Sequence, residues 1–359
     1  MQLPPFPWDS LAPYQARARA HPDGLIDLSV GTPVDPTPEF AQQALAQAAD
    51  AHGYPQVWGT PELRLSIINY LARRWNAETN EKQILPVIGT KELVAWLPTT
   101  LSLGVEDTVV FPALAYPTYD VGARAVGART LATDDPETAL AARPKLIWIN
   151  SPANPHGRIL TATQTRAWIT VARECGAVLA ADECYGEFGW EAEPVSVLDP
   201  AVNDGSAAGL LAIHSLSKRS NAAGFRAGFV AGDETLVQAQ LQIRKHLGMM
   251  LPTPTQAVMR ALLDDDAHVL TQRERYASRR AVLRPALEAA GLRIDASEGS
   301  LYLWATQGKD CWETIGWLAD LGILAAPGAF YTTTPESHVR IALTATDAQI
   351  EAAARRLTT

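Results

Sequence analysis

The stretch "HSLSKRSNAAGFRAGFVAGD", from His214 to Asp233, places a lysine at the end of a predicted buried strand. The apolar run "GLLAI" (209–213) directly precedes it, and small polar residues surround Lys218. A second cation, Arg226, stands just before another apolar run. In open α/β sheets, ligands bind outside the carboxyl ends of the strands. Lys218 therefore occupies a position where chemistry is expected.

Short apolar runs alternate with helical patterns from about residue 60 to 235, which predicts a mostly parallel sheet with crossover helices. Each run is short and apolar on both faces, as expected for a strand that is covered on both sides. Strands are expected at 84–88, 108–111, 145–149, 177–181, 210–214 and 227–231. Helices are expected at 90–103 and 161–176, and Thr60 followed by Pro61 opens another.

The rest of the chain predicts a second domain and an N-terminal arm. A long charged helical pattern (269–291) leads into strand-like runs at 299–305 and 338–343, which is typical of an α+β domain. The first 37 residues are rich in proline and show no helix of their own, so we expect them to lie across that domain or to reach a partner subunit. The predicted fold is α/β, with an arm (1–37) contributing to the small domain, a large domain (38–250) and a small C-terminal domain (251–359).

Composition limits the classes of function. The net charge of −9 argues against a broad nucleic-acid surface and against a polybasic membrane patch. Cys175, Cys184 and Cys311 are far apart and form no C-x-x-C motif, which fits a reducing compartment. The sequence shows neither a secretory leader nor a long apolar run, so we expect a cytoplasmic protein. The histidines are scattered without a metal-binding motif, so no metal is expected.

The residues that follow the expected strands form a coherent set. Taken singly, each has an ordinary explanation, such as an Asn-Pro-x-Gly turn, an aspartate helix cap or a solvated lysine. Taken together, they would bring an amine, a carboxylate, phenols, an amide, a guanidinium and a glycine-led helix start into one cleft. The set comprises Gly89, Thr90, Lys91, Tyr116, Asn154, Asp182, Tyr185, Ser215, Lys218 and Arg226.

These groups suit one aromatic, phosphorylated cofactor that carries an aldehyde. Lys218 would form a Schiff base with the aldehyde, helped by neighbouring cations that lower its pKa. Asp182 would keep a pyridine nitrogen protonated, and Tyr185 and Asn154 would hydrogen-bond the ring hydroxyl. A phosphate binds well at a helix start reinforced by a guanidinium and hydroxyls. Gly89, Thr90, Lys91, Ser215 and Arg226 could supply these contacts.

Motifs along essentially the whole chain resemble those of the fold-type I, pyridoxal-phosphate-dependent class I/II aminotransferases. They are "LSVGTPVDPTP", "YPQVWGTPELR", "IGTKEL", "PALAYPTY", "NSPANPHG", "ADECYGEF", "SLSK", "APGAFY" and "HVRIALT". Each block is a weak signal by itself, and their order and spacing make it strong. The resemblance implies an aspartate-aminotransferase-like fold and pyridoxal 5′-phosphate as cofactor.

The resemblance also implies roles for single residues. Lys218, Asp182 and Tyr185 would be catalytic, and Tyr116 would stack on the cofactor ring. Thr90, Lys91, Ser215 and Arg226 would contact its phosphate. Tyr54 would reach the phosphate of a neighbouring subunit, which implies a homodimer with shared active sites. Arg340 would grip the substrate α-carboxylate, a task suited to a bidentate guanidinium, beside Gly31 and Asn154.

Two stretches narrow the resemblance. "SKRSNAAGFRAGFVAGD" departs from the commoner Phe-Gly-Leu-Pro-Gly-Leu-Arg form after the lysine, and the chain begins with "PWDSLAPYQARARAHPDGLIDLSVGTPVDPTP" after a short lead. Both are most similar to the bacterial succinyldiaminopimelate aminotransferases of lysine synthesis. That similarity implies ping-pong transfer between glutamate/2-oxoglutarate and N-succinyl-2-amino-6-oxopimelate. The sequence does not assign the group that binds the distal end of the acceptor. The basic candidates are Arg219, Arg124 and Lys245, although basic residues of this kind are more often solvated at the surface than part of a substrate site.

Other functions stay open. Aminotransferases for aspartate, LL-diaminopimelate or aromatic substrates, and pyridoxal-phosphate-dependent C–S lyases, would keep the same cofactor residues. A nicotinamide-dependent reductase is disfavoured because no G-x-G-x-x-G follows a strand. A non-catalytic regulator that binds the cofactor is least supported, because it needs a DNA-binding module and only about 30 residues precede "LSVGTP".

Overall fold

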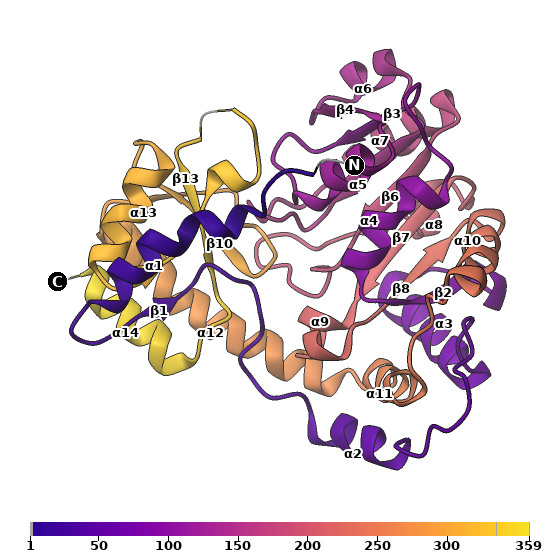
Figure 1. Cartoon of the computed structure of the whole chain (residues 1–359), viewed down its shortest axis with the longest axis horizontal. Coiled ribbons are helices and arrows are strands. Elements are labelled where there is room, and N and C mark those ends of the chain that lie inside the picture. Colours follow the sequence, from indigo (N-terminus) through magenta and orange to yellow (C-terminus); the bar gives the residue numbers. More distant parts are fainter. Residues whose placement is uncertain (1–2, 335, 359) are drawn as a thin grey trace.

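A seven-stranded sheet forms the centre of the large domain (Figure 1). The computed structural model describes residues 3–334 and 336–358. The strand order is β2-β8-β7-β6-β5-β3-β4; β8 runs antiparallel to β2 and β7, and the other neighbours are parallel. The strands are β2 (Ile84–Ile88), β3 (Thr108–Phe111), β4 (Arg129–Ala132), β5 (Leu146–Asn150), β6 (Val178–Asp182), β7 (Leu210–Ser215) and β8 (Ala227–Gly232).

The six predicted strands are confirmed within one residue at each end. Strand β4 was not predicted, because its "RTLA" is only partly buried and lacks the continuous apolar pattern of the others. It lies at the edge of the sheet, where one neighbouring strand is enough.

Helices cover both faces of this sheet. On one face, Leu63, Trp168 and Met259 belong to a single buried cluster with the strands. On the other face, Leu93, Tyr119 and Val237 belong to a second cluster. The large-domain helices are α2 (Glu39–Gln47), α3 (Pro61–Trp75), α4 (Thr90–Thr100), α5 (Thr118–Ala125), α6 (Pro136–Ala142), α7 (Ala162–Cys175), α8 (Pro200–Asn203), α9 (Leu216–Arg219), α10 (Glu234–Leu247) and α11 (Thr253–Leu263).

The predicted helix boundaries follow local chemistry. The Thr60 side chain accepts the Leu63 N–H at the start of α3, and Pro61 fills the first turn. Helix α7 ends where Gly176 adopts a left-handed conformation with φ of +60°.

The small domain is built on a four-stranded antiparallel sheet of order β12-β13-β10-β9. A two-residue strand of the arm, β1 (Ile26–Asp27), pairs in parallel with β11 (Ile323–Leu324). The remaining elements are β9 (Arg293–Asp295), β10 (Tyr302–Thr306), β12 (Ala326–Pro327), β13 (His338–Ala342), α12 (Ala267–Ala289), α13 (Cys311–Asp320) and α14 (Asp347–Leu357).

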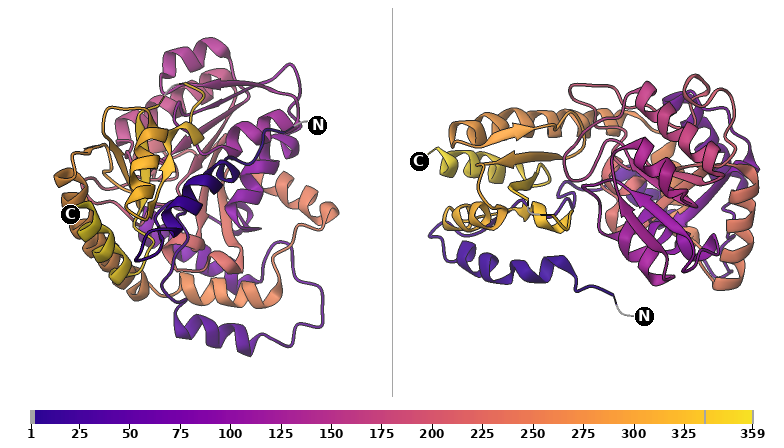
Figure 2. Two further views of the ribbon diagram at one scale, coloured as in Figure 1. Left: turned by 60° about the vertical axis from the view of Figure 1, so that its left-hand side comes forward. Right: turned by 90° about the horizontal axis from the view of Figure 1, so that it is seen from above.

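The arm contains helical structure, so the expectation that it has no helix is wrong. A 3₁₀ turn, η1 (Pro7–Leu11), leads into α1 (Ala12–Arg19), which packs against α13 (Figure 2). Helix α1 buries only Ala18 and has no apolar stripe. Its stability therefore comes from docking onto the small domain rather than from a pattern readable in its sequence.

The predicted domain boundary after residue 250 also needs adjustment. Helix α11 packs against α2 and α3, and Val258 and Met259 belong to the core of the large domain. We therefore place the proposed boundary between α11 and α12.

Candidate functional site

A cavity of about 360 Å³ lies at the carboxyl ends of the central strands, between the two domains. Its wall combines Gly31 of the arm, Asp182 at the end of β6 and Arg340 of β13. It brings together most of the residues predicted for the site: Gly31, Thr90, Lys91, Tyr116, Asn154, Asp182, Tyr185, Ser215, Lys218, Arg226 and Arg340.

Lys218 lies in the short helix α9, directly after β7. The Ser215 side chain accepts the Ser217 N–H at 3.2 Å and so caps this helix. The Lys218 ammonium donates a hydrogen bond to the Gly31 carbonyl oxygen. Burial lowers the pKa of Lys218, so the nucleophilic free amine is reached at lower pH than for an exposed lysine.

Asp182 is 8% exposed, and burial raises its pKa. The carboxylate accepts hydrogen bonds from Tyr119 Oη at 2.8 Å and from the Cys184 N–H at 3.2 Å, and the Cys184 side chain also interacts with it. A buried carboxylate at the base of a cavity favours a ligand with a protonated nitrogen. Sequence reasoning missed Tyr119, which lies in the first turn of α5, three residues after Tyr116.

Arg340 is 3% exposed, and no carboxylate pairs with it anywhere in the described chain. Its guanidinium donates to Asn154 Oδ1 at 2.8 Å and to the Ser29 carbonyl at 2.7 Å, while Nε has no partner. The rings of Tyr302 and Tyr331 lie 4.0 and 5.2 Å from it. A buried cation without a counter-charge is costly, so this position favours an anionic ligand.

Tyr302 and Trp8 are among the cavity residues that were not predicted. Tyr302 shares a 2.8 Å hydrogen bond with Tyr185; burial alone would raise its pKa, but the nearby Arg340 and Lys218 cations outweigh burial and lower it. Trp8 of η1 also lines the cavity, and its buried indole Nε1 has no hydrogen-bond partner among the described residues. The N-terminal "PWDSL" contributes to the family resemblance, but no local pattern predicts that Trp8 reaches the cavity, because the other cavity residues are distant in the sequence.

The other end of the cavity suits a phosphate. Gly89, between β2 and α4, has φ of +72°, and a Cβ there would lie 2.3 Å from Arg226 Nη2. The glycine therefore lets the guanidinium lie against the start of α4, where backbone N–H groups are free. Thr90 and Ser215 add hydroxyls, and Lys91 adds a cation at the rim. This donor set fits a dianionic phosphate.

Besides Gly89, four candidates lie outside the cavity lining. Tyr54 is 97% exposed. Arg219 is buried and pairs with Glu187 at 3.0 Å and with Asp266 at 3.1 Å, which is a structural arrangement. Arg124 pairs with Asp120 on α5, and Lys245 is exposed on α10.

Comparison with known proteins agrees with this geometry. The family model for "Aminotransferase class I and II" matches residues 23–357. The chain belongs to this family. It is therefore a pyridoxal-phosphate-dependent aminotransferase that acts on amino and keto acids, with the aspartate-aminotransferase-like fold predicted from its sequence.

Several relatives are similar over nearly the whole chain. The 4-dedimethylamino-4-oxo-anhydrotetracycline transaminase OxyQ of Streptomyces rimosus is 56% identical, with 99% of each chain covered. The "Probable aminotransferase Rv1178" of Mycobacterium tuberculosis is also 56% identical, with coverage of 99% of this chain and 85% of the relative. A solved structure of a probable N-succinyldiaminopimelate aminotransferase from Thermus thermophilus superimposes with a TM-score of 0.89 at 26% identity, covering 98% of this chain and 99% of that one.

Within residues 3–334 and 336–358, no helix is both long and apolar enough to cross a bilayer. The same residues contain no group of three or more His, Cys, Asp or Glu side chains that could hold a metal ion.

Proposed function

We propose that this aminotransferase moves an amino group between glutamate/2-oxoglutarate and N-succinyl-2-amino-6-oxopimelate. The observation that carries the proposal is the buried Arg340 guanidinium, which lacks a carboxylate partner and shares a cavity with Lys218. An α-carboxylate bound there would bring the substrate α-carbon toward the amine. The unpartnered Trp8 Nε1 suits the amide oxygen of a succinyl arm.

The cavity residues would share the work of the reaction. The bound cofactor supplies an aldehyde that carries the amino group and a ring that withdraws electrons. Lys218 would hold the cofactor and then move a proton at the substrate α-carbon. Asp182 would keep the ring nitrogen protonated, while Tyr185 and Asn154 would donate to the ring hydroxyl.

The remaining predicted contacts complete the cofactor site. Tyr116 would stack on the ring. Gly89, Thr90, Lys91, Ser215 and Arg226 would bind the phosphate through the start of α4 and its neighbouring cations.

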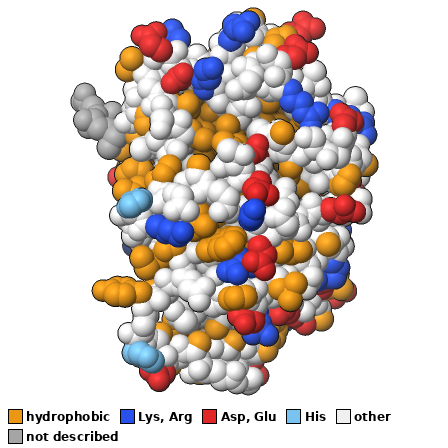
Figure 3. All heavy atoms as spheres, turned by 90° about the vertical axis from the view of Figure 1, so that its right-hand side faces the viewer, with side chains coloured by type: hydrophobic (Ala, Val, Ile, Leu, Met, Phe, Trp, Pro, Cys, Tyr) orange, Lys and Arg blue, Asp and Glu red, His pale blue; other side chains and the backbone are white. Residues whose placement is uncertain are grey.

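We also propose a cytoplasmic homodimer with shared active sites. The exposed Tyr54 supports it, because a phenol that is 97% exposed is available to a second subunit. Figure 3 shows further apolar side chains at the surface of the large domain, between groups of charged side chains. Size-exclusion chromatography with light scattering tests the assembly, and a monomer that retains full activity would contradict it.

A second candidate is amination of a polycyclic ketone. The 56% identity with OxyQ, whose name gives an oxo-anhydrotetracycline as substrate, favours this candidate. The aromatic side chains of Trp8, Tyr116 and Tyr302 on the cavity wall would suit fused rings.

Absorbance titration distinguishes the two. The cofactor band of the purified enzyme should change with L-glutamate and return on addition of N-succinyl-2-amino-6-oxopimelate, and Lys218→Ala should show neither change. Recovery only with 4-dedimethylamino-4-oxo-anhydrotetracycline would favour the second candidate. A protein that takes up no cofactor would refute both.

A further inference from the structure

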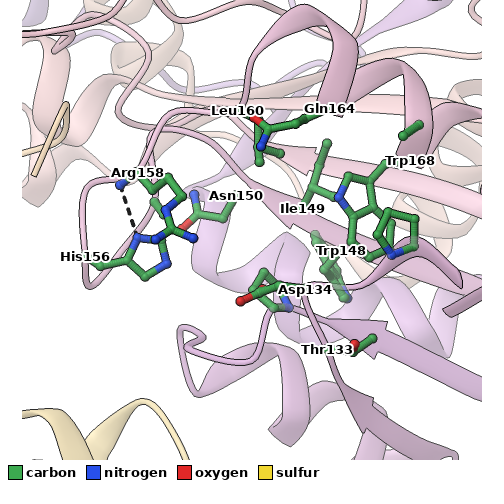
Figure 4. A pocket seen from close by; sticks show the side chains of 14 residues that line it. Thr133, Asp134, Trp148, Ile149, Asn150, His156, Arg158, Leu160, Gln164 and Trp168 are labelled. Atoms are coloured by element: carbon green, nitrogen blue, oxygen red, sulfur yellow. Dashed lines mark hydrogen bonds between the residues drawn. The ribbon is translucent and has the colours of Figure 1, made fainter. Parts of the chain in front are cut away.

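A second cavity, of about 210 Å³, lies where β3 and β5 separate (Figure 4). Pairing of β5 with β6 continues to Asn150 and Asp182, whereas pairing of β5 with β3 ends at Val110 and Ile147. The chain passes from β3 outward to β4 and then returns across β3 to β5, so the strand order reverses here. Ligands in open α/β sheets bind at such reversals.

One wall of this cavity is aromatic and apolar. Trp168 and Ile149 lie on it, and Figure 4 shows them across the cavity from His156 and Arg158. Trp148 also borders the cavity, but its ring belongs to the buried cluster on the other face of the sheet. Trp148 is 1% exposed, and its indole Nε1 has no hydrogen-bond partner within the part of the chain that the structure describes. An engineered cavity of about 150 Å³ holds a benzene molecule. The volume here is therefore sufficient for one aromatic side chain.

Two exposed side chains of opposite charge, Arg158 and Asp134, also line the cavity. Across the described residues, the Arg158 guanidinium makes neither an ion pair nor a hydrogen bond, and Asp134 accepts only the Ala113 N–H, at 3.1 Å. No ion pair joins Arg158 to Asp134, although both line the cavity. His156 Nδ1 accepts the Arg158 N–H at 3.1 Å, which leaves its other ring nitrogen free to donate. Separated opposite charges beside an aromatic wall match a zwitterion that carries a ring.

We propose that this cavity binds an aromatic α-amino acid. Its carboxylate would pair with Arg158 and its ammonium with Asp134, and its ring would lie against Trp168 and Ile149. This site is separate from the one that Arg340 and Lys218 form, and it does not depend on which acceptor the enzyme uses.

The cavity is linked to the cofactor site by two contacts. Asn150 lines both cavities; its Oδ1 accepts the Asn154 N–H at 2.7 Å, and its Nδ2 donates to the Asp182 carbonyl at 2.8 Å. Trp148 stacks on Tyr119 with ring centroids 4.9 Å apart, and Tyr119 holds the Asp182 carboxylate. An occupant that moves Asn150 or Trp148 therefore acts on residues of the cofactor site.

Calorimetric titration of the holoenzyme with L-phenylalanine tests the proposal, after aminooxyacetate has blocked the active-site cofactor. We expect one saturable site per chain, with L-leucine and phenethylamine binding at least about tenfold more weakly because each lacks one required group. Arg158→Gln should weaken binding about tenfold or more. Ala167→Leu, which fills the cavity from α7, should abolish binding while keeping the charges. Arg19→Gln, an exposed arginine of α1, is the matched control and should bind normally.

Three results would overturn the site. They are absence of saturable binding to the blocked holoenzyme, equal binding of L-leucine, and unchanged affinity in both Arg158→Gln and Ala167→Leu. Because the active site is blocked in this experiment, none of these results depends on the proposed transamination substrate.

Discussion

Replacing Tyr119 with phenylalanine removes one hydrogen-bond donor to the Asp182 carboxylate and changes little else. The ring that stacks on Trp148 stays, but Asp182 Oδ2 loses its 2.8 Å hydrogen bond. A hydrogen bond to a charged acceptor contributes about 1.5–3 kcal/mol. Since one pKa unit corresponds to about 1.4 kcal/mol, the pKa of Asp182 should rise by a further one to two units, roughly.

The assay is the pH dependence of kcat. An aspartate that must be ionised sets the acid limb, so Tyr119→Phe should move that limb upward by about one to two pH units and weaken cofactor binding. Tyr70→Phe is the matched control, because Tyr70 is a buried tyrosine that donates to Glu187 at 2.9 Å outside the cavity. The Tyr70→Phe variant should be less stable than the wild type, but the acid limb of its kcat profile should not move. An acid limb that is the same in both variants would refute the role given to Tyr119.

Three further predictions follow from the same geometry. Gly89→Ala should weaken cofactor affinity about tenfold in a titration of the apoenzyme, because the φ of +72° at Gly89 disfavours alanine and the added Cβ would displace Arg226. Unchanged affinity would contradict the proposal that the phosphate binds between Arg226 and the start of α4. Arg340→Gln should lower kcat/KM about a hundredfold through loss of a charged hydrogen-bonded pair, whereas Arg124→Gln on the surface should not. Burial raises the pKa of Glu183 from 4.5 to about 8. Between these two pH values the folded state keeps a proton that the unfolded state releases, so the free energy of unfolding falls as the pH rises. Urea unfolding at about pH 5.5 and about pH 8 should show a smaller fall for Glu183→Gln than for the wild type, and an equal fall would count against this reasoning.

Much of the fold was predictable because buried strands are visible in the sequence as short apolar runs. The partly exposed β4 was missed for the same reason. Strand direction was not predictable: β8 runs antiparallel to its neighbours although its composition resembles that of the parallel strands. Apolar runs report burial on two faces but carry no information about orientation.

The candidate site was predictable where it follows the sheet. Asp182 and Lys218 could be placed because the carboxyl ends of neighbouring strands converge. Arg340 entered only through a family resemblance, and Trp8 and Tyr302 were missed because tertiary packing alone brings them to the cavity. Arg219 was a candidate for the substrate because its ion-pair partner Asp266 is distant in the sequence.

The pairing of Ile26 with Ile323 has a consequence for how the chain is made. The arm leaves the ribosome first, but its partner strand is synthesised about 300 residues later. Until then Gly31, whose carbonyl receives the Lys218 ammonium, has no fixed position. The large domain can therefore assemble during translation, whereas the catalytic cavity closes only after β11 has emerged and paired with β1.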